Sequence, residues 1–267
     1  MKPTTAVILS VYNRPASVLV QTLAALFDSR DHEGFRVVVV DDGSGAKHRS
    51  EYRKIRRALD SELVWIETST LAARPETYHI GGHNNPAYCT NLAIDAARKL
   101  RLPRMLLLSS DVILEPHAIA RAQSNHSHSI VLGRVVDSFT RSVYCASDKI
   151  WPMCWFVLAD SAAIDHTRFD EMYLRGMAFE DNDFMARMFL LQGSIRIDDS
   201  IQCIHQSHPQ TAYSDRLHGF KISEAYTRQK WGGIPFRPGD DCLTYSIERE
   251  REGVAHLSNP KAKPLTP

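Results

Sequence analysis

Short apolar segments alternate with longer amphipathic segments through the first 111 residues, and few folds accommodate this alternation. The segments expected to form strands are AVILS (6–10), FRVVVVDD (35–42), LVWIE (63–67) and RMLLLSSD (104–111). Between them, apolar residues at helical spacing predict helices over 16–27, 47–59 and 86–100. The pattern predicts an α/β fold with a mostly parallel central sheet and flanking helices.

The second half of the chain is less regular. The expected elements are strands over 129–136 and 151–160, a helix ending at Gly193, two short strands over 194–197 and 200–205, and a helix over 214–231. Neither an internal repeat nor a linker divides the chain, so we expect a single domain. The tail over 259–267, rich in Pro and Lys, is predicted to be disordered.

The composition excludes several classes of protein. With 43% hydrophobic and 24% charged residues, the chain is neither disordered nor collagen-like, and a net charge of +1 argues against bulk capture of nucleic acid. The apolar runs are too short to span a bilayer, and the N-terminus does not resemble a signal peptide. The five cysteines show no Cys-x-x-Cys spacing and are expected to be reduced thiols. These features predict a cytoplasmic protein.

Polar residues follow the predicted strands where a sheet of this kind binds its ligands, beyond the carboxyl ends of the strands. They are Ser10, Tyr12 and Asn13 after the first strand, Asp41 and Asp42 after the second, and Ser110 and Asp111 after the fourth. The loop after the second strand lacks the glycine pattern of a phosphate-binding loop. Its carboxylates suit a base N–H or a ribose hydroxyl instead, so the sequence predicts a binding site at this edge.

Three acids crowd the first turn of the helix that ends at Gly193. Helix N-termini favour acids, which explains one or two of them, Asp183 among them, as groups that cap the helix. The adjacent pair Glu180-Asp181 needs a further reason.

Three further features leave alternatives open. The segment 47–59 carries six Lys or Arg around an apolar stripe, which favours a solvated helix face over a nucleic-acid patch. Asp111 can cap a helix or hold a divalent cation. His205 and His208 lie three apart, but the motif of a zinc hydrolase is missing.

Taken together, these segments resemble the GT-A fold glycosyltransferases, in particular the inverting family 2 enzymes that use nucleotide sugars. The segments that carry the resemblance are VILSVYNRP, VVVVDDGS, LLLSSDVILEP, FDEMYLRGMAFEDNDFMARMFLLQG and CIHQSH, in the order typical of the family. The resemblance covers roughly residues 4–231. It implies a Rossmann-like GT-A domain with a nucleotide-sugar-binding half (1–128) and an acceptor-binding, catalytic half (129–258).

The resemblance also implies roles for individual residues. Asp181 would be the general base that takes the acceptor's proton, and Glu180 would hold a sugar or acceptor hydroxyl. Asp111 would ligate Mn²⁺ or Mg²⁺ at the diphosphate, with His205 or His208 as second ligand. The residues expected to bind the nucleotide are Ser10, Tyr12, Arg14, Asp42, Asn85 and Ser110. Those expected at the acceptor or sugar are Trp151, Trp155 and Gly176, but the apolar surroundings of the two tryptophans favour core packing over sugar contact for them.

One position departs from the family pattern. The usual Asp-x-Asp motif reads Ser109-Ser110-Asp111, and a hydroxyl is a poorer cation ligand than a carboxylate. The cation would then be held by Asp111, a histidine and phosphate oxygens, or bound weakly.

The function expected from the resemblance is transfer of a hexose or N-acetylhexosamine from a UDP-sugar to an acceptor hydroxyl. The acceptor stays open among a glycan, a lipid-linked sugar, a protein and a modified DNA base, as does homo-oligomerisation. The alternatives are a nucleotidyltransferase of related topology and a sugar-nucleotide-binding scaffold without turnover. A nucleic-acid-binding module based on segment 47–59 is a further, weaker alternative.

Overall fold

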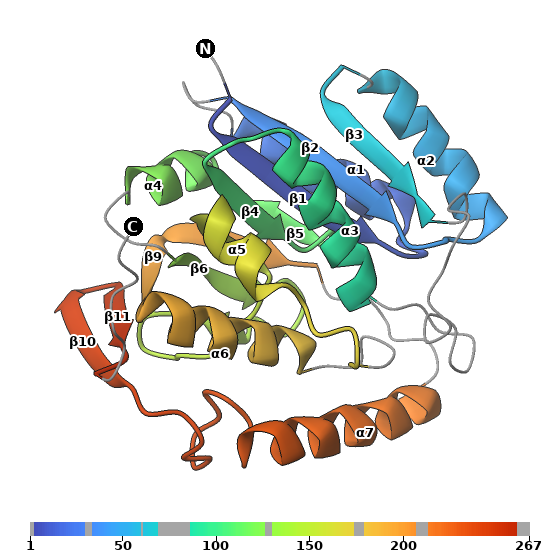
Figure 1. Ribbon diagram of the computed structural model, residues 1–267. Helices are drawn as coiled ribbons and strands as arrows, with labels where there is room; N and C mark the ends of the chain where they lie inside the picture. The colour runs from blue at the N-terminus through green and yellow to red at the C-terminus, as the bar shows by residue number, and fades with distance from the viewer. Residues whose placement is uncertain are drawn as a thin grey trace.

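The computed structural model describes residues 3–29, 34–59, 61–68, 86–125, 130–173, 179–206 and 213–260, with the side chains of 213–219 left out. Figure 1 shows these residues arranged around one twisted sheet. Most of the tail predicted to be disordered, residues 261–267, lies outside the described residues.

Strands and helices alternate through the N-terminal half as predicted. The strands are β1 (Thr5–Val11), β2 (Phe35–Asp41), β3 (Leu63–Glu67), β4 (Arg104–Leu108), β5 (Val112–Leu114), β6 (Ile130–Asp137), β7 (Val143–Cys145), β8 (Phe156–Asp160), β9 (Ser194–His205), β10 (Ser246–Arg251) and β11 (Val254–Ser258). The helices are α1 (Ala16–Asp28), α2 (Ala46–Ala58), α3 (Pro86–Lys99), α4 (Ala118–Ser124), α5 (Ser161–Thr167), α6 (Glu180–Gln192) and α7 (Tyr213–Trp231).

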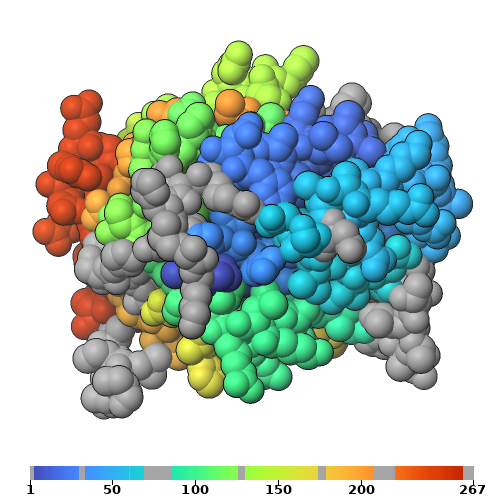
Figure 2. All heavy atoms as spheres, turned by 90° about the horizontal axis from the view of Figure 1, so that it is seen from above, coloured from blue at the N-terminus to red at the C-terminus, as the bar shows by residue number. Residues whose placement is uncertain are grey.

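The strands form one sheet in the order β10-β11-β9-β6-β8-β4-β1-β2-β3, with β5 paired to β9 and β7 to β6. The N-terminal strands β4, β1, β2 and β3 are mutually parallel, which confirms the predicted α/β class. Antiparallel β8 then joins β4 to β6, so the second half of the sheet is mixed. In Figures 1 and 2 the hairpin β10–β11 and the pair α2–β3 lie at opposite ends of the molecule.

Both faces of the sheet are buried, and the strand periodicity assigns each residue to a face. Along β1, Ala6 and Ile8 pack in the core layer of α3, α5 and α6, which lie in front of the sheet in Figure 1. Val7 and Leu9 pack in the opposite layer, with α1, α2 and α4. Burial on both faces explains why these strands read as continuous apolar runs in the sequence.

Several predicted boundaries were wrong. The predicted strand over 151–160 begins only at Phe156, and the strand over 104–111 ends at Leu108. The two short strands predicted over 194–197 and 200–205 are the continuous strand β9.

Strand β9 contains a bulge opposite Gly133. Asp198 pairs with Gly133 of β6 but Gln202 pairs with Arg134, so residues 199–201 bulge out between them. A Cβ atom on Gly133 would lie 2.8 Å from the Ile201 carbonyl oxygen, closer than real Cβ contacts, so glycine is needed there. Odd-numbered residues of β9 face one core layer before the bulge and the other layer after it, because an odd number of residues is inserted. The residues that show this are Ile195 and Ile197 before it, and Ile201 and Cys203 after it.

Among the described residues, none of the helices combines the length and apolar character that crossing a membrane requires.

Candidate active site

Two loops at the carboxyl edge of the sheet are locked together by hydrogen bonds. Val11 at the end of β1 pairs with Asp41 at the end of β2, so the loops that follow begin side by side. Asn13, in the left-handed region with φ of 46°, donates its backbone N–H to Ser44 Oγ (2.8 Å). Its Oδ1 accepts from the Gly45 N–H (2.7 Å). The predicted nucleotide residues Ser10, Tyr12 and Arg14 therefore belong to a fixed edge, with Tyr12 45% exposed.

The two acids after β2 have different surroundings. Asp41 Oδ1 accepts from the Ser44 N–H (3.0 Å) and shapes the turn, and burial raises the pKa of its carboxyl. Asp42, also buried, accepts a hydrogen bond from the Cys89 thiol of α3 (2.7 Å from Sγ to Oδ1). Asp41 is thus committed to the turn, and the nucleotide-binding role of Asp42 stays a prediction.

Asp111, in the turn between β4 and β5, is surrounded by a cluster of hydrogen-bond donors. Its Oδ1 accepts from Ser109 Oγ (2.5 Å), and its Oδ2 lies 2.9 Å from Arg14 Nη2 and 3.4 Å from His205 Nε2. Burial alone would raise the pKa of Asp111, but the His205 hydrogen bond and the Arg14 charge lower it to about 2. Asp111 is therefore a carboxylate at all physiological pH values. The neighbouring Ser110 is buried, with its carbonyl bonded to Thr22.

His205, the last residue of β9, lies between two carboxylates. Its Nε2 faces Asp111, and its Nδ1 lies 3.5 Å from Asp137 Oδ2, which also accepts from the Tyr144 hydroxyl (2.9 Å). Burial alone would lower the pKa of His205, but Asp111 and Asp137 together raise it. Sequence reasoning missed Asp137, because it stands one residue beyond the predicted strand and no spacing links it to His205.

The arrangement of Asp111 and His205 fits a divalent cation. The two ligand atoms lie 3.4 Å apart, a separation at which both can reach one ion. Asp137 on the other ring nitrogen completes the carboxylate–histidine pair that commonly orients a metal-binding imidazole. No group of three or more His, Cys, Asp or Glu side chains that could hold a metal occurs within the described ranges. A cation here would take its remaining ligands from the donor.

The acids of α6 have distinct roles. Asp183, 0% exposed, lies 2.7 Å from both Arg187 Nη2 and Lys230 Nζ and accepts from Trp231 Nε1 (2.8 Å). The expectation that it caps the helix was wrong: the N-terminal residue of α6 is capped by no side chain, and Asp183 instead ties α6 to α7.

Asp181 is the acid suited to proton transfer. Burial raises the pKa of its carboxyl to about 6, while backbone hydrogen bonds from Asn182 and Cys154 lower it. Burial, rather than the neighbouring acid, is thus the largest cause of the shift. The half-buried Glu180 precedes it as the first residue of α6.

The segment 151–155 contacts both Asp181 and His205. The backbone of Cys154 hydrogen-bonds to Asp181, and the next side chain, Trp155, lies 5.6 Å from the His205 ring and 4.6 Å from the Tyr144 ring, between centroids. A pocket of about 380 Å³ opens on this segment, lined by Tyr144, Lys149, Trp151, Met153 and Trp155. Trp151 and Trp155 therefore line a pocket, and Trp155 also packs against the core.

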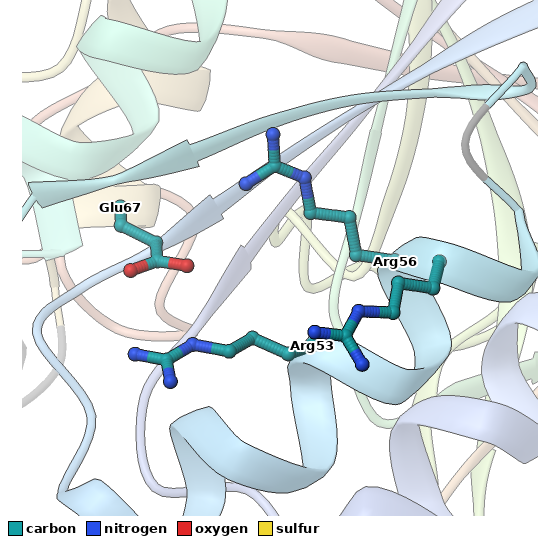
Figure 3. Close-up of a pocket in the computed structure, with 4 residues that line it drawn as sticks. Arg53, Arg56 and Glu67 are labelled. Carbon is teal, nitrogen blue, oxygen red and sulfur yellow. The ribbon is translucent and has the colours of Figure 1, made fainter.

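A second hollow lies on the flank of the sheet, away from Asp111. The hollow has a volume of about 410 Å³ and is lined by Arg53, Arg56, Arg57 and Glu67. Figure 3 shows Arg53 and Arg56 on α2 and Glu67 on β3. The apolar stripe of α2 packs inward, with Tyr52 buried, so its basic side chains face outward as predicted. A nucleic-acid partner for this face stays an alternative.

Three predicted site residues, Asn85, Gly176 and His208, lie outside the described residues.

The fold is that of a GT-A domain. Residues 6–63 match the family described as Glycosyl transferase family 2, and over this segment the match agrees with the resemblance to that family. No curated protein matches the chain.

Solved structures match the whole fold at low sequence identity. S. aureus TarS 1-349 in complex with UDP-GlcNAc matches with a TM-score of 0.62 and 17% identity, over 84% of this chain and 66% of that one. The mannosyltransferase PcManGT from Pyrobaculum calidifontis, in complex with GDP-Man and Mn²⁺, matches with a TM-score of 0.60 and 15% identity, over 88% and 66%. This chain thus spans just under two thirds of each relative. These matches show the GT-A fold.

Proposed function

We propose that the protein is an inverting glycosyltransferase that moves a hexose or N-acetylhexosamine from a UDP-sugar to an acceptor hydroxyl. One observation carries the proposal: segment 151–155 contacts Asp181, a carboxylate with a raised pKa, and also His205 beside Asp111. The proposed base and the proposed diphosphate position are therefore both in contact with this one segment, and inverting transfer requires the two to act on the same donor. The UDP-GlcNAc bound by TarS supports the donor class.

The donor half, residues 1–128, supplies the nucleotide contacts in this proposal. Tyr12, exposed at the carboxyl edge, stacks on the base, and Asp42 accepts from its N–H. Four further residues complete the nucleotide site: Ser10, Arg14, Asn85 and Ser110.

Asp111 and His205 hold a divalent cation, with His208 as a further ligand. The cation would neutralise the charge that develops on the leaving diphosphate. The Mn²⁺ in the GDP-Man complex of PcManGT supports this assignment by analogy of fold.

The acceptor half, residues 129–258, carries the proton transfer. The acceptor sugar packs against Trp151 and Trp155 near Gly176, because aromatic faces suit the apolar face of a pyranose, and Glu180 holds one of its hydroxyls. Asp181 removes the proton from the attacking hydroxyl. Its pKa of about 6 leaves it ionised at neutral pH yet basic enough to accept a proton.

The test is a thermal-shift panel of UDP, GDP, CDP and dTDP with their sugars, each with Mn²⁺, Mg²⁺ or EDTA. A ligand at about 100 times its Kd stabilises the folded state by about 2.7 kcal/mol, which raises Tm. We expect UDP with Mn²⁺ to give the largest shift. Asp181→Asn should keep that shift and abolish transfer to a saccharide acceptor. Binding without transfer by the unaltered protein would favour the scaffold alternative, and no shift with any nucleotide would refute the proposal.

A further inference from the structure

Arg14 occupies the carboxylate that the proposed cation would need. Its guanidinium comes from the loop after β1 and reaches Asp111 Oδ2 at 2.9 Å, with the Arg14 side chain 26% and the Asp111 side chain 6% exposed. The other carboxylate oxygen already accepts from Ser109. Both oxygens of Asp111 are thus engaged by protein donors.

Arg14 and a cation compete for the same carboxylate oxygen. Where a family motif would place a second carboxylate, this chain has Ser109, and the guanidinium of Arg14 contacts Asp111 Oδ2. A divalent cation approaching Oδ2 must displace a guanidinium of like charge. A nucleoside diphosphate brings negative charge of its own and offers the guanidinium another partner.

Arg14 is placed to change partner. Its backbone is fixed, because its carbonyl accepts from the Tyr52 hydroxyl (2.6 Å), but its side chain is partly exposed. Its Nε is buried without a hydrogen-bond partner among the described residues, so the present position of the side chain leaves one donor unsatisfied. A guanidinium presents a fork of N–H groups that matches phosphate oxygens as well as carboxylates.

We infer that Arg14 makes cation binding conditional on the donor: the diphosphate draws Arg14 away from Asp111 and so opens Oδ2 to the ion. This inference rests on the proposed function, which supplies the diphosphate. Arg14 acts as a positioning residue that couples the two ligands, and it prevents occupation of Asp111 by a cation alone. Coupling of this kind is reciprocal, so each ligand strengthens the binding of the other.

The experiment compares Arg14→Met with the unaltered protein in two titrations. Binding of Mn²⁺ alone, followed by electron paramagnetic resonance of the free ion, should become about tenfold tighter in Arg14→Met, because a competing charge is removed. Binding of UDP in EDTA, followed by calorimetry, should become about tenfold weaker, because a phosphate partner is lost. Damage to the fold would weaken the binding of both Mn²⁺ and UDP. Tighter Mn²⁺ binding together with weaker UDP binding would therefore identify Arg14 as the residue that couples the two ligands.

Two control variants complete the design. Arg53→Met removes a guanidinium from the distant hollow on α2 and should change neither titration. Arg14→Lys keeps the charge and should leave Mn²⁺ binding close to that of the unaltered protein, which provides a readout even if Arg14→Met does not fold.

Unchanged or weaker Mn²⁺ binding in Arg14→Met, with an unaltered Tm, would overturn the inference, as would clearly tighter Mn²⁺ binding in Arg14→Lys. Absence of UDP binding in the unaltered protein under every condition would instead refute the proposed function. The Mn²⁺ titration would still decide whether Arg14 competes for Asp111.

Discussion

The carboxylate of Asp137 lies 3.5 Å from Nδ1 of His205 and so fixes the direction in which the opposite ring nitrogen points. Its Oδ1 accepts from the backbone N–H groups of Phe139 (2.9 Å) and Thr140 (2.7 Å), while Oδ2 faces His205 and Tyr144. Asp137 therefore holds a turn with one oxygen and orients the imidazole with the other.

Asp137→Asn should weaken Mn²⁺ binding in the presence of UDP by about 10- to 100-fold, because the amide no longer orients the imidazole as the carboxylate does. Calorimetry with UDP held in excess measures the effect. Tyr144→Phe removes only the hydroxyl that supports Asp137 and serves as the milder control. Equal Mn²⁺ affinity in Asp137→Asn would show that His205 is not a ligand.

Transfer should lose activity as pH falls through about 6, because Asp181 must be ionised to act as the base and burial raises its pKa to that value. A profile of kcat against pH between about 5 and 8, with donor and acceptor saturating, measures this dependence. A profile without an ionisation near pH 6 would assign the base to another group.

Asp181→Asn should stabilise the protein at neutral pH. The folded-state pKa of about 6 lies above the ordinary value of 3.8 for an aspartate, so folding favours the protonated form and stability falls as pH rises from about 4 to 6. Removing the ionisable group should restore up to about 3 kcal/mol at pH 7. Urea unfolding at pH 4 and pH 7 gives the comparison, and a gain at pH 4 as large as that at pH 7 would contradict it.

Asp183→Ala should have the opposite effect and destabilise the protein by about 2 kcal/mol, since it removes a buried carboxylate that pairs with two partly exposed cations and accepts an indole hydrogen bond. The partners that lose it are Arg187, Lys230 and Trp231. Urea unfolding of Asp183→Ala and Asp181→Asn at the same pH compares the two stabilities. A loss in the first variant and a gain in the second would distinguish the structural acid from the proposed base. A loss of stability below about 1 kcal/mol would mean that α7 does not depend on this contact.

Ser109→Asp restores two carboxylates to the motif and should tighten binding of Mn²⁺ alone by about tenfold, because the local charge becomes negative. The same change should lower Tm in EDTA, since a carboxylate would replace the hydroxyl that donates to Asp111. Unchanged Mn²⁺ affinity would show that the missing acid does not limit cation binding.

Trp151→Ala should raise the KM for a saccharide acceptor by about tenfold while leaving UDP binding unchanged, because the pocket loses one aromatic wall. Initial rates at varied acceptor, with calorimetry of UDP as the control, measure both quantities. A loss of UDP affinity as large as the rise in the acceptor KM would indicate that Trp151 contacts the donor and not the acceptor.

The sequence predicted the N-terminal half of the fold well, because strands buried on both faces are continuously apolar and end in polar residues. It missed the hairpin β10–β11, because every residue of β10 is exposed and charged residues fill it, so no alternation of burial marks the strand. The acidic helix was predicted from its pattern, and Gly193 ends it with φ of 77° as expected.

The chemistry of the site was only partly predictable. Asp111 and His205 could be named from the family pattern, but the ion pair between Arg14 and Asp111 joins two loops that only the sheet order brings together. The role of Asp183 likewise depends on Lys230 and Trp231, which lie far along the chain. Contacts of this kind leave no local periodicity in the sequence.

The bulge at residues 199–201 has a consequence for the evolution of this chain. Beyond the bulge, Gln202 to His205 pair with Arg134 to Asp137 of β6, so this pairing and not the number of bulged residues sets the face that His205 occupies. Gene variants that gain or lose a single codon at 199–201 should therefore keep the imidazole beside Asp111. A single-codon change within 202–205 would instead shift the register and turn the imidazole to the other face, and selection should purge it.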